Sequence, residues 1–137
     1  MTEEEVQIKL SQHIATHYPN AVFHNDFGSG VKLGWTRAKR QKSMNIRRGF
    51  PDLQICEPIG KWNGFFLELK KDGIRIVKKD GTLVADEHVR EQAEFIAKLR
   101  DRGYYADFAI GLKDSIRKVD DYMEGRAKDG EWTNWHP

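Results

Sequence analysis

The stretch GFPDLQICEPIGKWNGFFLELKKDG, residues 49–73, predicts two β-strands joined by a connection rich in turn-forming residues. The strands are DLQIC and GFFLELK, and EPIGKWN lies between them. Asp52 stands at the entrance of the first strand, where Pro51 favours an extended backbone. Glu68 and Lys70 interrupt the apolar run of the second strand. Hydrophobic residues would stabilise these three positions better than charged ones, so the charges call for an explanation.

Side-chain alternation places Glu68 and Lys70 on the same face of their strand. If the two strands pair antiparallel, Asp52 at the start of the first lies beside both residues. Two close carboxylates repel each other, and a hard divalent cation such as Mg²⁺ or Mn²⁺ removes the conflict and activates water for phosphate chemistry. The alternative interpretation is an ordinary charge pair on a solvated face of the sheet.

The pattern of the whole chain predicts an α/β fold. Apolar periodicity indicates helices over residues 2–17, 87–102 and 114–123, and further strands over 21–27 and 104–110. Asp80-Gly81 predicts the turn of a small hairpin over 74–85. This order is typical of a central mixed β-sheet flanked by helices. We expect residues 1–125 to form a single domain and residues 126–137 a C-terminal tail.

Length and composition exclude several classes of protein. A chain of 137 residues with 39% hydrophobic residues is expected to form one globular domain. We expect no signal peptide and no membrane span, hence a cytoplasmic protein. The single cysteine, Cys56, cannot form an internal disulfide and is interpreted as a small core residue. GSGVKLG lacks the Gly-Lys-Ser/Thr ending of a P-loop, so no nucleotide cofactor is expected.

Positive charge is concentrated between Asp26 and Asp52, where no acidic residue occurs. The net charge of the chain is +2, so the rest of the chain is net negative. This distribution predicts that the segment binds a polyanion such as the phosphate backbone of DNA, and the alternative is a solvated basic loop. Whether WTRAKRQKSM within it forms a short helix or a loop stays open. The basic residues are Lys32, Arg37, Lys39, Arg40, Lys42, Arg47 and Arg48.

Polar residues also accompany the apolar stripes of two predicted helices. Glu3 and Gln7 are four residues apart beside the stripe of the first helix, and Gln92 falls within the stripe of the second. Each glutamine alone is explained by a hydrogen bond at the boundary of the core. Their occurrence together with the three charged residues favours a shared site.

Four other polar residues are weaker candidates. His13 and His17 have a spacing that suits a transition metal, but the sequence offers no third ligand. His24 and Asp26, near the end of the first strand, would approach the metal site or a phosphate, or would simply be exposed.

Three motifs together resemble a known family. GFPDL, Glu68-Leu69-Lys70 separated from Asp52 by fifteen residues, and EQAEFIAKLRDRGYYADFAIG at 91–111 resemble the PD-(D/E)XK nuclease superfamily. Within it the chain is most similar to the virus-type replication-repair nuclease (VRR-NUC) domain in its standalone phage and bacterial form. The resemblance runs from Glu3 to Met123. DGIRIVKKDGTLVAD at 72–86 is a longer insertion than the family pattern leads us to expect.

The resemblance implies a restriction-endonuclease-like core and assigns roles to residues. Asp52, Glu68 and the Leu69 carbonyl would bind the metal, and Lys70 would be the catalytic lysine. Gln92 and Glu3 match further catalytic positions. Gln7 would support the first-helix position, and Glu5 is the alternative to Glu3.

The sequence therefore predicts a Mg²⁺- or Mn²⁺-dependent endodeoxyribonuclease that hydrolyses phosphodiester bonds. No recognition-helix signature is present, which favours selection of DNA structure over base sequence. The resemblance implies branched DNA such as Holliday junctions or flaps, a homodimer, and the cytoplasm of a bacterium or a phage-infected cell. One alternative is a non-catalytic DNA-binding module on a nuclease-like scaffold, and another is an RNA-directed or restriction-type nuclease.

Overall fold

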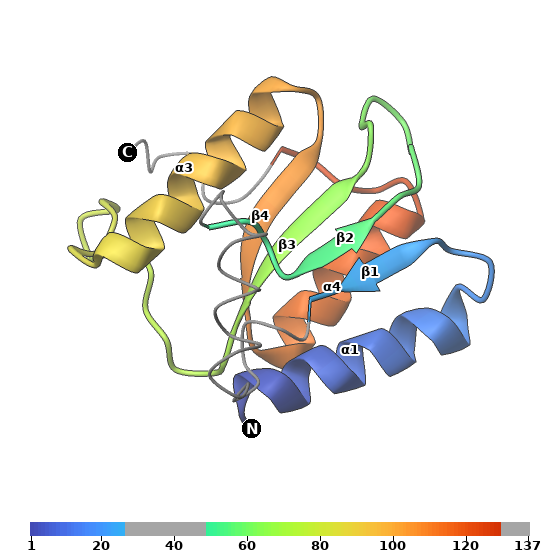
Figure 1. The fold of residues 1–137 in the computed structure, drawn as a ribbon, viewed down its shortest axis with the longest axis horizontal. Helices are drawn as coiled ribbons and strands as arrows, with labels where there is room; N and C mark the ends of the chain where they lie inside the picture. The colour runs from blue at the N-terminus through green and yellow to red at the C-terminus, as the bar shows by residue number, and fades with distance from the viewer. Residues whose placement is uncertain (27–48, 130–137) are drawn as a thin grey trace, which may run out of the picture.

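The computed structural model describes residues 1–26 and 49–129, and Figure 1 shows how their helices and strands are arranged. The predicted α/β fold is confirmed in this part of the chain. The elements in order are α1 (Glu3–His17), β1 (Phe23–Asn25), β2 (Leu53–Ile55), β3 (Phe65–Lys70), α3 (Glu87–Asp101), β4 (Tyr105–Ile110) and α4 (Gly111–Met123).

The four strands form one mixed sheet in the order β1-β2-β3-β4. β1 and β2 pair antiparallel, as do β2 and β3, whereas β3 and β4 run parallel. The antiparallel pairing predicted for the two strands of residues 49–73 is therefore confirmed, with Leu53 opposite Leu67. The parallel pair is joined through α3, as a parallel connection requires.

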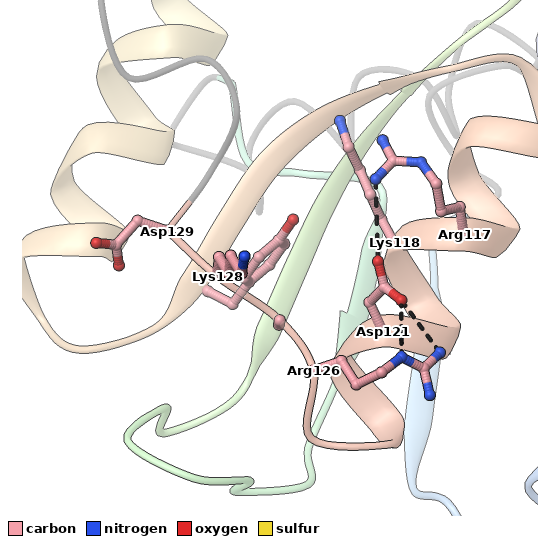
Figure 2. A pocket seen from close by; sticks show the side chains of 8 residues that line it. Arg117, Lys118, Asp121, Arg126, Lys128 and Asp129 are labelled. Carbon is pink, nitrogen blue, oxygen red and sulfur yellow. Dashed lines mark hydrogen bonds and ion pairs between the residues drawn. The ribbon is translucent and has the colours of Figure 1, made fainter.

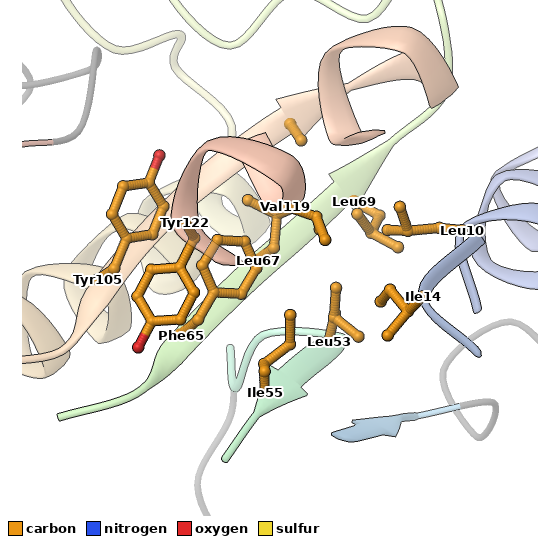
Figure 3. Close-up of a cluster of buried hydrophobic side chains, with 11 residues drawn as sticks. Leu10, Ile14, Leu53, Ile55, Phe65, Leu67, Leu69, Tyr105, Val119 and Tyr122 are labelled. Carbon is orange, nitrogen blue, oxygen red and sulfur yellow. The ribbon is translucent and has the colours of Figure 1, made fainter. Parts of the chain in front are cut away.

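The two faces of the sheet pack against different helices. Side chains of α1 and α4 cover one face, where Phe65, Leu67 and Leu69 of β3 are fully buried (Figure 3). α3 covers the other face, where Phe66 is buried. Because both faces are covered, all six residues of β3 are buried, and Glu68 and Lys70 are carried into the interior with them.

The beginnings of α1 and α3 are both capped by side chains. Thr2 and Glu5 form a capping box, in which the Thr2 hydroxyl accepts from the Glu5 amide and the Glu5 carboxylate accepts from the Thr2 amide. Asp86 accepts from the Val89 amide at 3.1 Å and caps α3. These caps set where the first turns of the two helices lie, and Glu3 is the first residue of α1.

The predicted hairpin over 74–85 is a short turn with a single antiparallel bridge, between Val77 and Leu83. The Thr82 carbonyl accepts from the Lys78 amide at 2.7 Å. Gly81, at φ +87°, takes the left-handed conformation that the Asp-Gly turn requires. The turn was therefore predicted correctly, but its arms are not extended into strands of the sheet.

The prediction that Cys56 is a core residue is wrong, because its side chain is exposed. β2 ends at Ile55, whose side chain is fully buried, and the next side chain points away from that face. Among the described residues, no helix has both the length and the apolar character needed to cross a membrane.

Candidate metal centre

Three carboxylates from distant parts of the chain meet at one end of the sheet. Glu3, Asp52 and Glu68 each offer an oxygen, and these atoms all lie within 4.8 Å of one another. Glu3 comes from the first turn of α1, Asp52 from the entrance of β2 and Glu68 from the middle of β3. Asp52 and Glu68 are buried, and Glu3 is half-buried.

The backbone of β3 holds Asp52 in place. β2 begins at Leu53, so Asp52 lies just beyond the last paired position, and its Oδ2 accepts from the Leu69 amide at 3.1 Å. The amide and carbonyl of a strand residue point to the same side of the strand. The Leu69 carbonyl therefore faces the side on which Asp52 lies, as a backbone ligand at this site would need.

Burial and mutual repulsion shift the pKa values of two of the carboxyls. The pKa of Glu68 is raised well above its usual value, first by burial and then by the charge of Asp52. The positive charge of Lys70 opposes this shift only in part. The pKa of Glu3 is also raised, first by burial and then by the charge of Asp52. Lys70, His88 and Lys71 act in the opposite direction and lower this pKa in part. Without a bound cation, burial and the neighbouring carboxylate therefore disfavour the ionised forms of Glu68 and Glu3.

Gln92 on α3 orients Glu68. Its Nε2 donates to Glu68 Oε1 at 2.7 Å and lies 3.2 Å from Nε2 of His88, one helical turn earlier. The Gln92 side chain is buried, and its Oε1 has no hydrogen-bond partner among the residues that the structure describes. A buried acceptor without a partner is costly, and it is suited to a water molecule or a ligand in the site.

The remaining sequence candidates divide into two groups. Lys70 is buried, and its charge acts on both Glu68 and Glu3, which places it at the carboxylates. Gln7 is buried on α1, where its backbone carbonyl accepts from Nδ2 of Asn25. Glu5 is exposed in its capping box, so the structure brings Glu3 and not Glu5 to the cluster.

The donor set fits a hard divalent cation. Three carboxylate oxygens and a backbone carbonyl are ligands that Mg²⁺ and Mn²⁺ prefer, and no sulfur or imidazole lies in the group. A cation among them would offset the repulsion that raises the pKa of Glu68. The unpartnered Gln92 Oε1 would be available as an acceptor for a water bound to such a cation.

The histidine pair of α1 has a structural role. His13 Nε2 lies 2.8 Å from Asp120 Oδ1 of α4, and the Tyr18 hydroxyl donates to the same oxygen at 2.8 Å. The centroids of the two histidine rings are 4.4 Å apart, but within residues 1–26 and 49–129 the two histidines and Asp120 do not form a group of three ligand atoms close enough to hold one ion. His24 is exposed on β1, and the Asp26 amide donates to the Asp52 carbonyl at 2.7 Å.

The structure also has a cavity whose lining includes none of the three carboxylates. It is a cavity of about 350 Å³ between the start of β4, α4 and the segment that follows α4 (Figure 2). Arg117 and Arg126 in its lining are both paired with Asp121, which offsets part of the positive charge of the lining. No candidate residue from the sequence lies in it.

The predicted DNA-binding residues are all in the segment that the structure does not describe. Lys32, Arg37, Lys39, Arg40, Lys42, Arg47 and Arg48 lie outside residues 1–26 and 49–129.

Sequence reasoning missed two residues near the site. His88 is four residues before Gln92 on the same helix face, a spacing that was available as a signal. Phe50 precedes Asp52 by two residues and is exposed. As an apolar residue it was not distinguishable in the sequence from a core residue.

Comparison with solved structures agrees with this fold. A solved structure described as a "VRR_NUC domain protein" superposes with a TM-score of 0.67 and 25% sequence identity, covering 96% of this chain and 94% of that chain. No protein-family model matches the sequence, and no curated protein matches it. The structural match confirms the family resemblance predicted from the motifs: over nearly its whole length, this chain has the fold of a VRR-NUC domain.

Proposed function

We propose that this protein is a nuclease that depends on Mg²⁺ or Mn²⁺ and hydrolyses phosphodiester bonds of DNA. The observation that carries the proposal is the approach of the Glu3, Asp52 and Glu68 oxygens to within 4.8 Å of one another. The similarity to a VRR-NUC domain protein supports a nuclease-type domain. Within that class we propose an endonuclease that selects branched DNA and acts as a homodimer, because two related sites suit a symmetric junction.

Asp52, Glu68 and the Leu69 carbonyl would hold the cation, and Glu3 completes the carboxylate group. The bound cation would lower the pKa of a water and polarise the phosphate. In hydrolysis, the attacking water loses a proton and its oxygen forms a new bond to phosphorus, the phosphorus–oxygen bond to the leaving group breaks, and the leaving oxygen gains a proton. The chain's own residues orient and stabilise these groups.

Lys70 and Gln92 support the reaction in different ways. The Lys70 ammonium is buried beside the carboxylates and stabilises negative charge that develops on the phosphate, or positions the attacking water. Gln92 fixes the rotamer of Glu68 through the 2.7 Å hydrogen bond, so that the carboxylate is oriented before substrate binds.

The test is cleavage of linear, flap and four-way DNA by the purified protein in Mg²⁺ and in Mn²⁺. We expect cleavage with either ion, none with a chelator, and loss of at least two orders of magnitude in Asp52→Ala, Glu68→Ala and Lys70→Ala. Glu94→Ala and Lys98→Ala, exposed on α3, are matched controls and should keep full activity.

Full activity in Asp52→Ala or Lys70→Ala would refute the proposed site. Binding that survives loss of the carboxylates, with no cleavage in either metal, would instead identify a DNA-binding module on a nuclease-like scaffold.

A further inference from the structure

Phe50 is a large apolar side chain that stays exposed beside the carboxylates. Its side chain is 49% exposed although it packs against two other aromatic rings. The ring meets Phe66 edge-on, with centroids 5.4 Å apart, and Phe95 with centroids 4.9 Å apart. Two aromatic neighbours therefore support the ring from the protein side, and the remainder of its surface faces outward.

The backbone on both sides holds this ring rigidly. Gly49 has φ +84° and lies so close to α3 that an added Cβ would stand 2.7 Å from the Glu91 carbonyl oxygen. Pro51 is buried on the other side and has a restricted φ. Phe50 is thus fixed before any ligand arrives, which lowers the entropy cost of a contact with its exposed surface.

The ring also has a defined relation to the metal site, because every element that supports it contributes a site residue. Asp52 follows Phe50 by two residues. Glu68 follows Phe66 by two residues on the same face of β3, a spacing of about 7 Å. Gln92 precedes Phe95 by three residues on α3, about 4.5 Å along the helix axis. The aromatic ring therefore lies on the same three segments that carry Asp52, Glu68 and Gln92.

We propose that Phe50 is a stacking platform for an unpaired base of the substrate, next to the phosphate that is cut. This inference rests on the proposed function and names the substrate class: DNA in which a base at the branch point is unpaired and unstacked. An aromatic ring stacks on any base, since every base has a π-face. Bases inside a duplex already stack on their neighbours, so the ring gains little from paired DNA. It gains most where a branch leaves a base exposed.

The experiment compares two branched DNA substrates that differ only in one nucleotide, unpaired at the branch point in one and paired in the other. The measured quantity is kcat/KM for each, with the wild-type protein and with Phe50→Leu, Phe50→Tyr and Val22→Ala. Val22 is the matched control, because it is an exposed apolar residue far from Asp52. It lies just before β1, and its carbonyl accepts from the amide of Cys56, which follows the last residue of β2.

We expect the wild type to prefer the unpaired substrate by about tenfold, within the range that base–aromatic stacking supplies. Phe50→Leu keeps an apolar contact with Phe66 and Phe95 but loses the π-face, so the preference should fall to near one. Phe50→Tyr should retain it, and Val22→Ala should not change it. An unchanged preference in Phe50→Leu would overturn the inference and leave Phe50 a packing residue.

A second measurement applies even if Phe50→Leu folds poorly. 2-Aminopurine placed at the unpaired position should lose fluorescence when wild-type protein binds in the presence of a chelator, because stacking on the ring quenches it. Unchanged fluorescence on binding would overturn the inference. Absence of cleavage of both substrates in Mg²⁺ and Mn²⁺ is a different result, because it would refute the proposed function itself.

Discussion

At the scale of the residue, Glu68 shows a conflict between stability and the proposed chemistry. Its carboxyl is 3% exposed and close to Asp52, so its ionised form destabilises the metal-free fold. Glu68→Gln keeps the shape and can still bond to Gln92 while removing the charge. We expect this variant to unfold at a higher temperature than the wild type at pH 7 in a chelator, and to lose cleavage activity.

The control for this prediction is Glu94→Gln, the same chemical change at an exposed position of α3. It should change the unfolding temperature by little, because surface substitutions stay within about 0.5 kcal/mol. A Glu68→Gln protein that unfolds at a lower temperature than the wild type would show that the carboxylate stabilises the metal-free fold, contrary to the expectation.

Individual site residues differed in how well the sequence predicted them. Asp52 and Glu68 were predictable because strand alternation and one antiparallel pairing are enough to bring them together. Glu3 was preferred to Glu5 because it shares a helix face with Gln7, and the structure places Glu3 at the cluster while the capping box uses Glu5. The prediction for Cys56 was wrong because it rested on the hydrophobicity of cysteine. The exposure of Cys56 depends instead on its position just after the last residue of β2.

At the scale of the element, charged side chains close the free edge of β4. The Ala106 carbonyl accepts from Arg100 Nε at 2.7 Å, and the Phe108 carbonyl accepts from Lys118 Nζ at 2.6 Å. The amides of Phe108 and Ile110 donate to carboxylates of Asp107 and Asp114. Outward-facing backbone groups of this edge strand are thus occupied by side chains, which disfavours pairing with another strand.

Lys118→Met tests this network. Lys118 is buried, with its Nζ 3.5 Å from the fully buried Asp107, and its loss removes one of the two cations that pair with this carboxylate, leaving Arg100 at 3.3 Å. We expect a loss of about 1.5–3 kcal/mol in the free energy of unfolding, measured by urea denaturation, because Arg100 still pairs with the Asp107 carboxylate.

Lys113→Met, exposed on the same helix, should cost little. Combining Lys118→Met with Asp107→Asn should recover part of the lost stability, because the second change neutralises the carboxylate. A loss in Lys118→Met no larger than in Lys113→Met would show that the buried pair does not stabilise β4.

The loop that enters β2 depends on a glycine. At Gly49, a side chain would meet both a left-handed φ of +84° and the Glu91 carbonyl oxygen at 2.7 Å. Gly49→Ala should therefore destabilise the protein and displace Asp52, with a loss of cleavage activity.

Gly60→Ala separates the two costs. Gly60 has φ +59° and no heavy atom within 4 Å of an added Cβ, so this variant should carry only the backbone cost of about 1–2 kcal/mol. Thermal unfolding and cleavage rates check the pair. Equal losses in both variants would show that contact with α3 does not matter.

At the scale of the whole molecule, the site unites one end of the sheet with two helices from opposite faces. Glu3 comes from α1 on one face and Gln92 from α3 on the other, and β3 carries Glu68 between them. The sequence predicted the helices from periodicity, because each buries an apolar stripe. It could not predict the hydrogen bonds of Gln92, because they depend on the rotation of α3 over the sheet.

Because the site contains carboxyls with raised pKa values, the stability of the folded protein should depend on pH and on a bound metal ion. In a chelator, folded Glu68 and Glu3 hold protons at a higher pH than in the unfolded chain, since both pKa values are raised above 4.5. The folded state then binds more protons, so its stability should fall as pH rises above 4.5.

A divalent cation should reverse this trend, because it binds the ionised carboxylates and releases protons. At a concentration 100 times its dissociation constant, Mg²⁺ or Mn²⁺ should add about 2.7 kcal/mol to the free energy of unfolding. Thermal unfolding from pH 5 to pH 8, with and without the metal, measures both effects. Glu68→Gln should lose most of the metal-induced stabilisation and flatten the pH dependence, whereas Glu94→Gln should behave as the wild type. Equal stabilisation of wild type and Glu68→Gln by the metal would mean that the cation binds elsewhere on the chain.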